Sequence, residues 1–182
     1  GIDIGGGSGR GLIGSFDGEK MAIEEICRFE NKPIYKGDML VWDAPMLRRE
    51  VENATRLGAS MGAQSVGIDT WGVDYGLVDK KGELVCDPYS NRDVRTRGIG
   101  DYFSQFMPLS RLYEITGIQY LEFNTVLQLA AEKKFTPERL EKADKILFLP
   151  DLFGYFLSGE QVSEYTVAST GAIVDAHTRD FS

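Results

Sequence analysis

The stretch that most constrains the fold of this chain is its glycine-rich beginning, GIDIGGGSGRGLIG. Residues 2–4 have the character of a short strand that runs into the glycines, and apolar residues resume at 12–16. Asp17-Gly18 is a strong hairpin turn, and a second apolar stretch follows at 21–29. The first 30 residues therefore predict three consecutive antiparallel strands with no helix between them.

Glycine-rich turns of this kind have several uses. Gly9, Gly11 and Gly14 match the G-x-G-x-x-G pattern of dinucleotide-binding folds, but that motif needs a helix to begin at the glycines, and here a hairpin follows. The chain contains no G-K-[ST], which excludes a Walker loop. Two alternatives remain: the strand–turn–strand phosphate loop of actin-like kinases and Hsp70-type ATPases, and a hairpin without a ligand in which Asp3 caps the turn.

The chemistry of a phosphate loop can be assigned residue by residue. Glycines allow the backbone to approach phosphate oxygens and to turn its N–H groups toward them. A serine adds a hydroxyl donor, an arginine adds a planar fork, and a carboxylate can hold Mg²⁺ through water. The expected phosphate-binding residues are Gly6, Gly7, Ser8, Gly9 and Arg10, and the expected metal ligand is Asp3.

Farther along the chain, helical and strand patterns alternate. Asp43 and Pro45 predict the start of an amphipathic helix that buries residues at helical spacing from Leu47 to Met61. The other expected elements are a buried strand at 65–69, a hairpin of strands at 75–78 and 83–86, a helix after Asn124, a short helix at Thr136-Pro137, a strand at 145–149, and a helix capped by Asp151 and ended by Gly159. This order predicts one α/β domain over residues 1–182.

Composition narrows the classes of function. The chain has 182 residues and a net charge of −8, which argues against a nucleic-acid surface, since that would need a basic stripe. No apolar run approaches the ~18 residues of a membrane span. Cys27 and Cys86 form no disulfide framework, which favours a reducing, cytoplasmic location. The single histidine, His177, makes a histidine-based metal site or a Ser-His-Asp triad a poor interpretation.

A second motif, IDTWGVDYGLVD at 68–79, follows the predicted amphipathic helix. Together with GGGSGR it resembles the N-terminal domain of the FGGY family of carbohydrate kinases, and most closely its rhamnulokinase branch. The resemblance extends through VWD at 41–43, NRDVRT at 91–96, GIQYLEFNTVLQL at 117–129, LPDLFGYFLSG at 149–159 and EYTVAST at 164–170. Asn91 departs from it, standing where a tyrosine is expected before Arg-Asp.

The resemblance implies a ribonuclease-H-like α/β domain of the actin-like ATPase and sugar kinase type, with a mixed five-stranded sheet and flanking helices. ATP would place its phosphates on the loop at 6–10 with Mg²⁺, and a ketose would be phosphorylated, in the nearest branch L-rhamnulose to L-rhamnulose 1-phosphate. Gly72 would contact the sugar through its backbone, and Trp71, Asp74 and Arg92 are expected as further contacts. L-Fuculose or D-xylulose as substrate, and a non-catalytic actin-like nucleotide-binding domain, remain alternatives.

Each site residue also has a purely structural interpretation. Trp71 can belong to the core, Asp74 can cap the following turn, and Arg92 can form an ion pair with Asp93. The resemblance further places the catalytic base, an aspartate, beyond residue 182 and the adenine site in a second domain. The expectation is therefore an N-terminal fragment whose partner is its own C-terminal domain and which is inactive alone.

Overall fold

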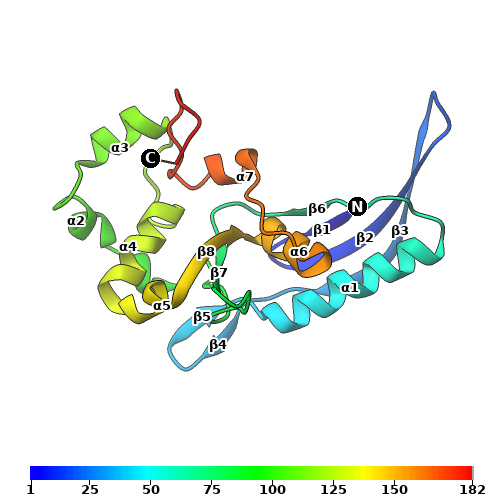
Figure 1. The fold of residues 1–182 in the computed structure, drawn as a ribbon, viewed down its shortest axis with the longest axis horizontal. Helices are drawn as coiled ribbons and strands as arrows, with labels where there is room; N and C mark the ends of the chain where they lie inside the picture. The colour runs from blue at the N-terminus through cyan, green and yellow to red at the C-terminus, as the bar shows by residue number, and fades with distance from the viewer. Residues whose placement is uncertain (182) are drawn as a thin grey trace.

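A computed structural model describes residues 1–181 and shows a mixed four-stranded sheet with the strand order β3-β2-β1-β6 (Figure 1). The strands are β1 (Ile2–Ile4), β2 (Ser8–Phe16), β3 (Met21–Glu30) and β6 (Ile68–Thr70). The first three are antiparallel neighbours, and β6 runs parallel to β1. The prediction of three consecutive antiparallel strands is confirmed.

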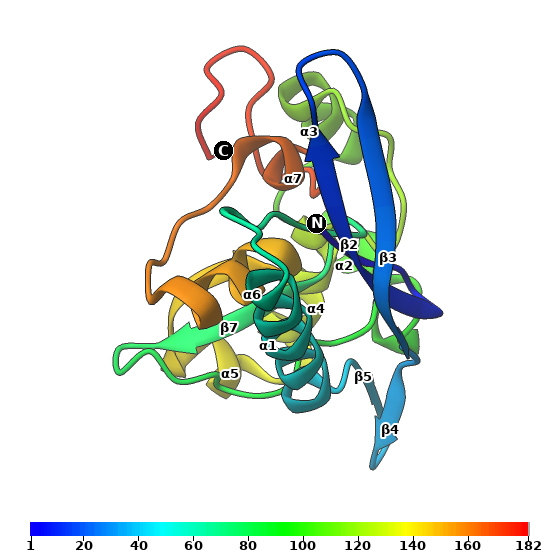
Figure 2. The ribbon, with the colours of Figure 1, turned by 90° about the vertical axis from the view of Figure 1, so that its right-hand side faces the viewer.

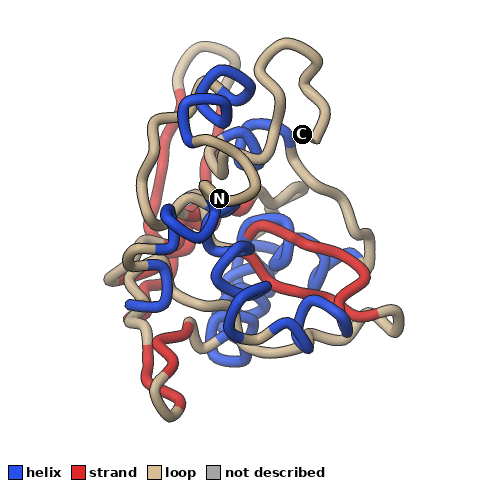
Figure 3. Tube along the Cα trace, turned by 90° about the vertical axis from the view of Figure 1, so that its left-hand side faces the viewer, coloured by secondary structure: helices blue, strands red, loops and turns tan. Residues whose placement is uncertain are grey.

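The sheet has four strands within the described residues, where five were expected. A tight turn after β6, closed by the Asp74 N–H donating to the Gly72 carbonyl at 2.9 Å, redirects the chain. As a result β7 (Tyr75–Asp79) leaves the large sheet and pairs antiparallel with β8 (Ala143–Phe148). A separate small hairpin joins β4 (Ile34–Lys36) to β5 (Met39–Val41). Figure 3 shows the strands in these separate groups with helices between and beside them.

Helix α1 (Ala44–Ser60) begins where the sequence predicts. The Asp43 carboxylate accepts from the Met46 N–H at 2.9 Å, and Pro45 lies in the first turn. The buried residues of α1 are Ala44, Leu47, Val51, Ala54 and Gly58. Met61, which was expected to continue this buried stripe, lies just past the helix end and is 46% exposed. Figure 2 shows the β2–β3 hairpin extending beyond this helix.

The large sheet has one apolar and one polar face. Ile2 and Ile4 pack in the core with residues of α1 and of α6 (Leu149–Ser158). Side chains alternate across a strand, so Asp3 and Arg10 lie on the opposite face, where both are partly or fully exposed. The sequence motif at the start of the chain therefore places its charged residues on the face away from the core.

Two predicted strands differ from the structure. β6 begins only at Ile68, and Val66 is 45% exposed, because the chain crosses the surface between the end of α1 and the sheet. The expected turn at 79–83 is present, with the Asp79 N–H donating to the Glu83 carbonyl at 2.9 Å. The segment after it forms only an isolated bridge at Leu84, since the ladder partner of β7 is β8.

Helices after β7 complete the fold. They are η1 (Val94–Thr96), α2 (Ile99–Phe103), α3 (Leu109–Thr116), α4 (Thr125–Phe135), α5 (Pro137–Lys142) and α7 (Tyr165–Ser169). The expected starts of α4 and α5 and the left-handed Gly159 at the end of α6 are confirmed. Asp151 is not the cap of α6, because the helix begins two residues earlier. Within residues 1–181 no helix is long and apolar enough to cross a membrane.

Candidate functional site

The glycine loop between β1 and β2 is held from behind by one buried residue. The Asn31 side-chain amide donates to the Gly5 carbonyl at 2.8 Å, and the Asn31 backbone N–H donates to the Gly7 carbonyl at 3.2 Å. Gly5 N–H donates to the Ser8 carbonyl at 2.8 Å. Among the hydrogen bonds of residues 1–181, none uses the N–H groups of Gly6 or Gly7. The loop therefore has its Gly5 and Gly7 carbonyls hydrogen-bonded and leaves two adjacent N–H donors free, as a phosphate cradle requires.

The other expected phosphate residues lie in β2 rather than in the loop. Gly9 stands opposite Ile4 and Phe29 in the ladder, and a Cβ atom on Gly9 would overlap the Phe29 ring. Packing therefore explains this glycine without a ligand. Ser8 is exposed at the start of the strand. The structure narrows the loop expected at 6–10 to Gly6 and Gly7, with Ser8 and Arg10 flanking it.

Arg10 and Asp3 face each other across β1 and β2. The Arg10 guanidinium donates to Asp3 Oδ2 through Nε at 2.9 Å and lies 2.8 Å from it through Nη2. The carboxylate is partly exposed, and no hydrogen bond or ion pair among residues 1–181 uses its Oδ1. Mg²⁺ is commonly held by one or two carboxylates together with substrate phosphates and water. Asp3 fits that role, although the described residues contain no cluster of three or more candidate metal ligands.

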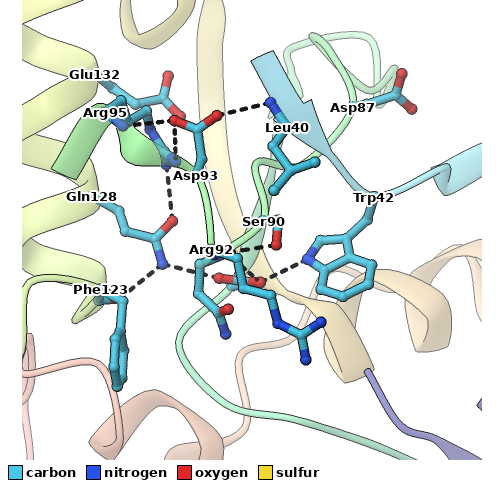
Figure 4. Close-up of polar contacts among 12 residues, drawn as sticks. Leu40, Trp42, Asp87, Ser90, Arg92, Asp93, Arg95, Phe123, Gln128 and Glu132 are labelled. Atoms are coloured by element: carbon cyan, nitrogen blue, oxygen red, sulfur yellow. Dashed lines mark hydrogen bonds and ion pairs between the residues drawn. The ribbon is translucent and has the colours of Figure 1, made fainter. Parts of the chain in front are cut away.

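The structure corrects the expectation that Asp74 contacts a sugar. Asp74 is fully buried, and both carboxylate oxygens already accept hydrogen bonds. Oδ2 accepts from Trp42 Nε1 at 2.7 Å, Trp71 Nε1 at 2.9 Å and the Asn91 N–H at 3.0 Å, and Oδ1 accepts from Gln128 Nε2 at 3.0 Å. Burial raises the pKa of this carboxyl, and its four donors oppose that shift. Figure 4 shows Gln128 and Trp42 on opposite sides of this network, each with a dashed line that runs toward its centre.

Gly72 lies beside this network at a surface groove. The groove has a volume of about 700 Å³ and is bordered by β6, α6 and α7, with Gly72 and Thr170 in its wall. A Cβ atom on Gly72 would lie 2.6 Å from Thr170 Oγ1, so a larger residue here would require Thr170 to shift. Trp71 is partly buried and packs against the buried Trp42, with ring centroids 4.2 Å apart and the rings tilted by 43°. Trp71 therefore combines packing with a position next to the groove.

Arg92 lies next to the glycine loop. Its side chain is exposed, and its Nη2 lies 3.0 Å from the position that a Cβ atom on Gly6 would take. Trp42 Cη2 lies 3.9 Å from the same position. Asp93, the alternative partner of Arg92, instead accepts from the backbone of Leu40 and Arg95 (Figure 4). The structure thus brings Arg92 and Trp42 close to Gly6, with Trp71 packed against Trp42.

Sequence analysis did not predict two residues whose hydrogen bonds support the candidate site. Asn31 supports the glycine loop, and nothing in its local sequence marks it. Gln128 lies in the recognised FNTVLQL stretch, but no role follows from the motif alone. Its amide donates to Asp74 and to the carbonyls of Val73 and Phe123, while its Oε1 accepts from Arg95 Nη2 at 2.8 Å.

A buried charge cluster lies behind Gln128. The guanidinium groups of Arg95 and Arg139 lie 3.7 and 4.2 Å from the ring centroid of Tyr89. Glu132 is buried beside them, with Oε2 3.5 Å from Arg139 Nε. Burial raises the pKa of Glu132, and the two arginines oppose this shift. The cluster fixes α4 and α5 against the segment that carries Arg92.

Comparison with known proteins identifies the family. The sequence model for the N-terminal domain of the FGGY family of carbohydrate kinases matches residues 1–182. The chain belongs to the FGGY family of carbohydrate kinases. The rhamnulokinase of Bacteroides thetaiotaomicron is 42% identical over 180 residues, which cover 98% of this chain and 37% of that protein. The rhamnulokinase of Halalkalibacterium halodurans is 40% identical over 181 residues, covering 98% and 38%.

Solved structures confirm the fold of this FGGY domain. A ligand-bound xylulose kinase from Lactobacillus acidophilus superposes with a TM-score of 0.84 at 17% identity, covering 100% of this chain and 37% of that one. The xylulose kinase from Rhodospirillum rubrum gives the same TM-score at 13% identity, covering 100% and 39%. The predicted sugar-kinase fold class is therefore confirmed. The chain spans under two fifths of the length of these relatives.

Proposed function

We propose that the protein carrying this FGGY domain is an ATP-dependent kinase that converts L-rhamnulose to L-rhamnulose 1-phosphate. The observation that carries the proposal is the glycine loop, in which the N–H groups of Gly6 and Gly7 are free and Arg92 and Trp42 lie close to Gly6. The choice of ketose rests on similarity: the rhamnulokinases reach 42% identity, whereas the two xylulose kinases share 13–17%. The location proposed for the protein is the cytoplasm.

The residues of this chain would form two groups, one that binds ATP and one that binds the sugar. Gly6, Gly7, Ser8 and Arg10 would bind the phosphates of ATP, and the Asp3 carboxylate would hold Mg²⁺, which supplies neutralisation of phosphate charge. The backbone of Gly72 and the side chains of Trp71 and Arg92 would bind the ketose, with Arg92 positioned next to the loop. Such a site would accelerate the reaction by positioning the reactants and stabilising charge, because the protein does little covalent chemistry in phosphoryl transfer. We propose that the second domain supplies the proton acceptor and the adenine site.

The direct test uses the full-length protein with ATP, Mg²⁺ and a panel of L-rhamnulose, L-fuculose and D-xylulose, with ADP release as the readout. The expected result is the highest kcat/KM for L-rhamnulose. A preference for another ketose would overturn the substrate, and nucleotide binding without turnover of any sugar would favour a non-catalytic actin-like domain.

Matched variants of one segment test the sugar side. Arg92→Ala is expected to raise the KM for the ketose by ~10- to 100-fold, since a charge-assisted hydrogen bond contributes about 1.5–3 kcal/mol. Arg97→Ala removes another exposed arginine five residues away and is expected to leave this KM within about twofold. Equal effects of the two variants would argue against a specific contact by Arg92.

A further inference from the structure

The turn that carries Gly72 is strained. Val73 has φ of +68°, a value that is an outlier for a β-branched residue, and the Asp74 N–H donates to the Gly72 carbonyl two residues back. This combination is that of a γ-turn with positive φ, which is rare and strained. Such conformations persist only where the surroundings over-determine them, and they gather at functional sites. The contacts that hold this turn therefore indicate what it is for.

Two helical side chains hold the central carbonyl of the turn. The Val73 carbonyl accepts from Thr125 Oγ1 at 2.7 Å and from Gln128 Nε2 at 3.2 Å. Both donors lie on α4, and both are buried. Gln128 uses the same amide to reach Asp74, so one side chain fastens two consecutive residues of the turn.

The Asp74 carboxylate fastens the other end of the turn to both tryptophans of the chain. Its Oδ2 accepts from both indole N–H groups and also from the backbone of Asn91, the residue before Arg92. All four partners of the carboxylate are donors, so an ionised carboxylate satisfies the whole set and an amide in its place cannot. Removing such an acceptor leaves several buried donors unpaired.

The indole pair connects the turn to the glycine loop. Trp42 contacts Trp71 on one side, and its Cη2 lies 3.9 Å from the Cβ position of Gly6 on the other. Of the two indoles bonded to Asp74, Trp42 therefore extends toward the glycine loop, and Trp71 is the residue directly before Gly72. The sugar side and the phosphate side of the site share a single buried acceptor.

We propose that Asp74 is the positioning residue that fixes the Gly72 turn and the Gly6 loop relative to each other. This inference rests on the proposed function, because the two sides matter only if a sugar and a phosphate bind there. In kinases of this kind, catalysis depends on holding both reactants in one geometry. Asp74 acts through the indoles and the turn and does not itself touch a substrate.

The test compares Asp74→Asn with Asp93→Asn in the full-length protein. Asp74→Asn is expected to raise the KM values for ATP and for the ketose together and to lower kcat/KM by ~10- to 100-fold. Asp93 is also buried and bonded to backbone N–H groups, but it contacts neither indole. Asp93→Asn is therefore expected to lower the urea midpoint of unfolding without raising either KM.

A second readout needs no substrate. Two indoles this close couple their excited states and give a paired circular-dichroism band, which the difference spectrum between wild type and variant isolates. The band is expected to be lost in Asp74→Asn and retained in Asp93→Asn. Unchanged KM values together with a retained band in Asp74→Asn would overturn the proposal.

Two further outcomes, an Asp74→Asn variant that does not fold and a wild type without activity, also test the proposal. If Asp74→Asn does not fold, Trp42→Phe removes one indole donor while keeping the carboxylate and an aromatic ring, and it is expected to raise both KM values in the same direction. Unaltered KM values in Trp42→Phe would then overturn the proposal. Absence of turnover in the wild type with any ketose would refute the proposed function, while the circular-dichroism band would still report whether Asp74 fixes the indoles.

Discussion

Arg10 stands where the phosphate loop meets the polar face of the sheet. Its guanidinium pairs with Asp3 at 2.8 Å and is partly exposed. We expect Arg10→Ala to raise the KM for ATP by ~10- to 100-fold, because a charge-assisted hydrogen bond to an anionic oxygen contributes about 1.5–3 kcal/mol. Steady-state kinetics at varied ATP and saturating ketose measure this change.

Arg28 provides the control for Arg10. It lies directly opposite Arg10 on β3 and pairs with Glu25 instead of Asp3. Arg28→Ala removes the same charge one strand farther from β1 and is expected to change the KM for ATP by no more than about twofold. An equal rise in both variants would mean that the general positive potential, and not Arg10 itself, binds the nucleotide.

Glu164 gives the protein a pH dependence at the start of α7. Its carboxylate accepts from the Thr166 N–H and the Val167 N–H, each at 2.9 Å, and from Thr166 Oγ1 at 2.5 Å. These bonds lower the pKa of Glu164. A lowered folded pKa stabilises the fold above the unfolded value of about 4.3, and this stabilisation is lost as the pH falls through the folded pKa.

The variant that isolates this effect is Glu164→Gln. The wild type is expected to have the higher urea midpoint at about pH 7, and the difference is expected to shrink as the pH falls below about 4.3 and through the lowered folded pKa of Glu164. Urea unfolding of both proteins across this range measures it. A difference that stays constant with pH would show that the carboxylate charge plays no part.

At the scale of elements, β2 and α1 approach each other at a glycine. A Cβ atom on Gly11 would lie 2.7 Å from Cys27 Sγ and 3.2 Å from Ala54 Cβ. Gly11→Ala therefore forces the strand and the helix apart and is expected to cost about 1–3 kcal/mol of the free energy of unfolding. Chemical denaturation measures the loss.

Gly14 is the matched control in the same strand. A Cβ atom there meets nothing within 4 Å, and its φ is not in the positive region. Gly14→Ala is expected to leave stability unchanged or to raise it by about 0.4–1 kcal/mol, since alanine restricts the unfolded chain. Comparable losses in both variants would mean that the strand backbone, rather than contact with α1, requires glycine.

Local patterns in the sequence predicted where helices and strands form far better than they predicted which strands pair with each other. The hairpin turn at Asp17-Gly18 and the Asp43 cap act over a few residues, so the first three strands and α1 follow from sequence alone. The expected fifth strand of the sheet did not appear, because strand partners depend on contacts between distant segments. β7 pairs with a strand about 70 residues later, and no local signal carries that information.

In the candidate site, too, features set by local sequence were predicted and features set by contacts between distant segments were not. Gly72 and Arg92 belong to recognisable motifs, and in the structure Gly72 lies in the wall of the groove and Arg92 lies close to Gly6. Asp74 lies in that motif too, but its burial depends on Gln128 from α4 and Trp42 from before α1, so its structural role became visible only in the fold. Asn31 reaches the glycine loop from the end of β3, beyond the range of any local pattern.

At the scale of the whole molecule, three distant segments meet behind the Gly72 turn. Thr125 Oγ1 donates to the Val73 carbonyl, and the Val126 N–H donates to the Gly171 carbonyl at 3.1 Å. A Cβ atom on Gly171 would lie 2.5 Å from Thr125 Oγ1 and 3.3 Å from the Phe148 ring. The strained turn, α4 and the segment after α7 are therefore in close contact at this one point.

Gly171→Ala tests whether this junction stabilises the whole fold. We expect a loss of about 1–3 kcal/mol in the free energy of unfolding, because the neighbouring atoms are the buried Thr125 and Phe148, which have little room to move. Gly154→Ala is the control: it lies within α6 and a Cβ atom there meets nothing within 4 Å, so a gain of up to about 1 kcal/mol is expected. Urea unfolding of the three proteins decides. Equal stability of Gly171→Ala and the wild type would mean that the segment after α7 moves aside freely and does not brace the Gly72 turn.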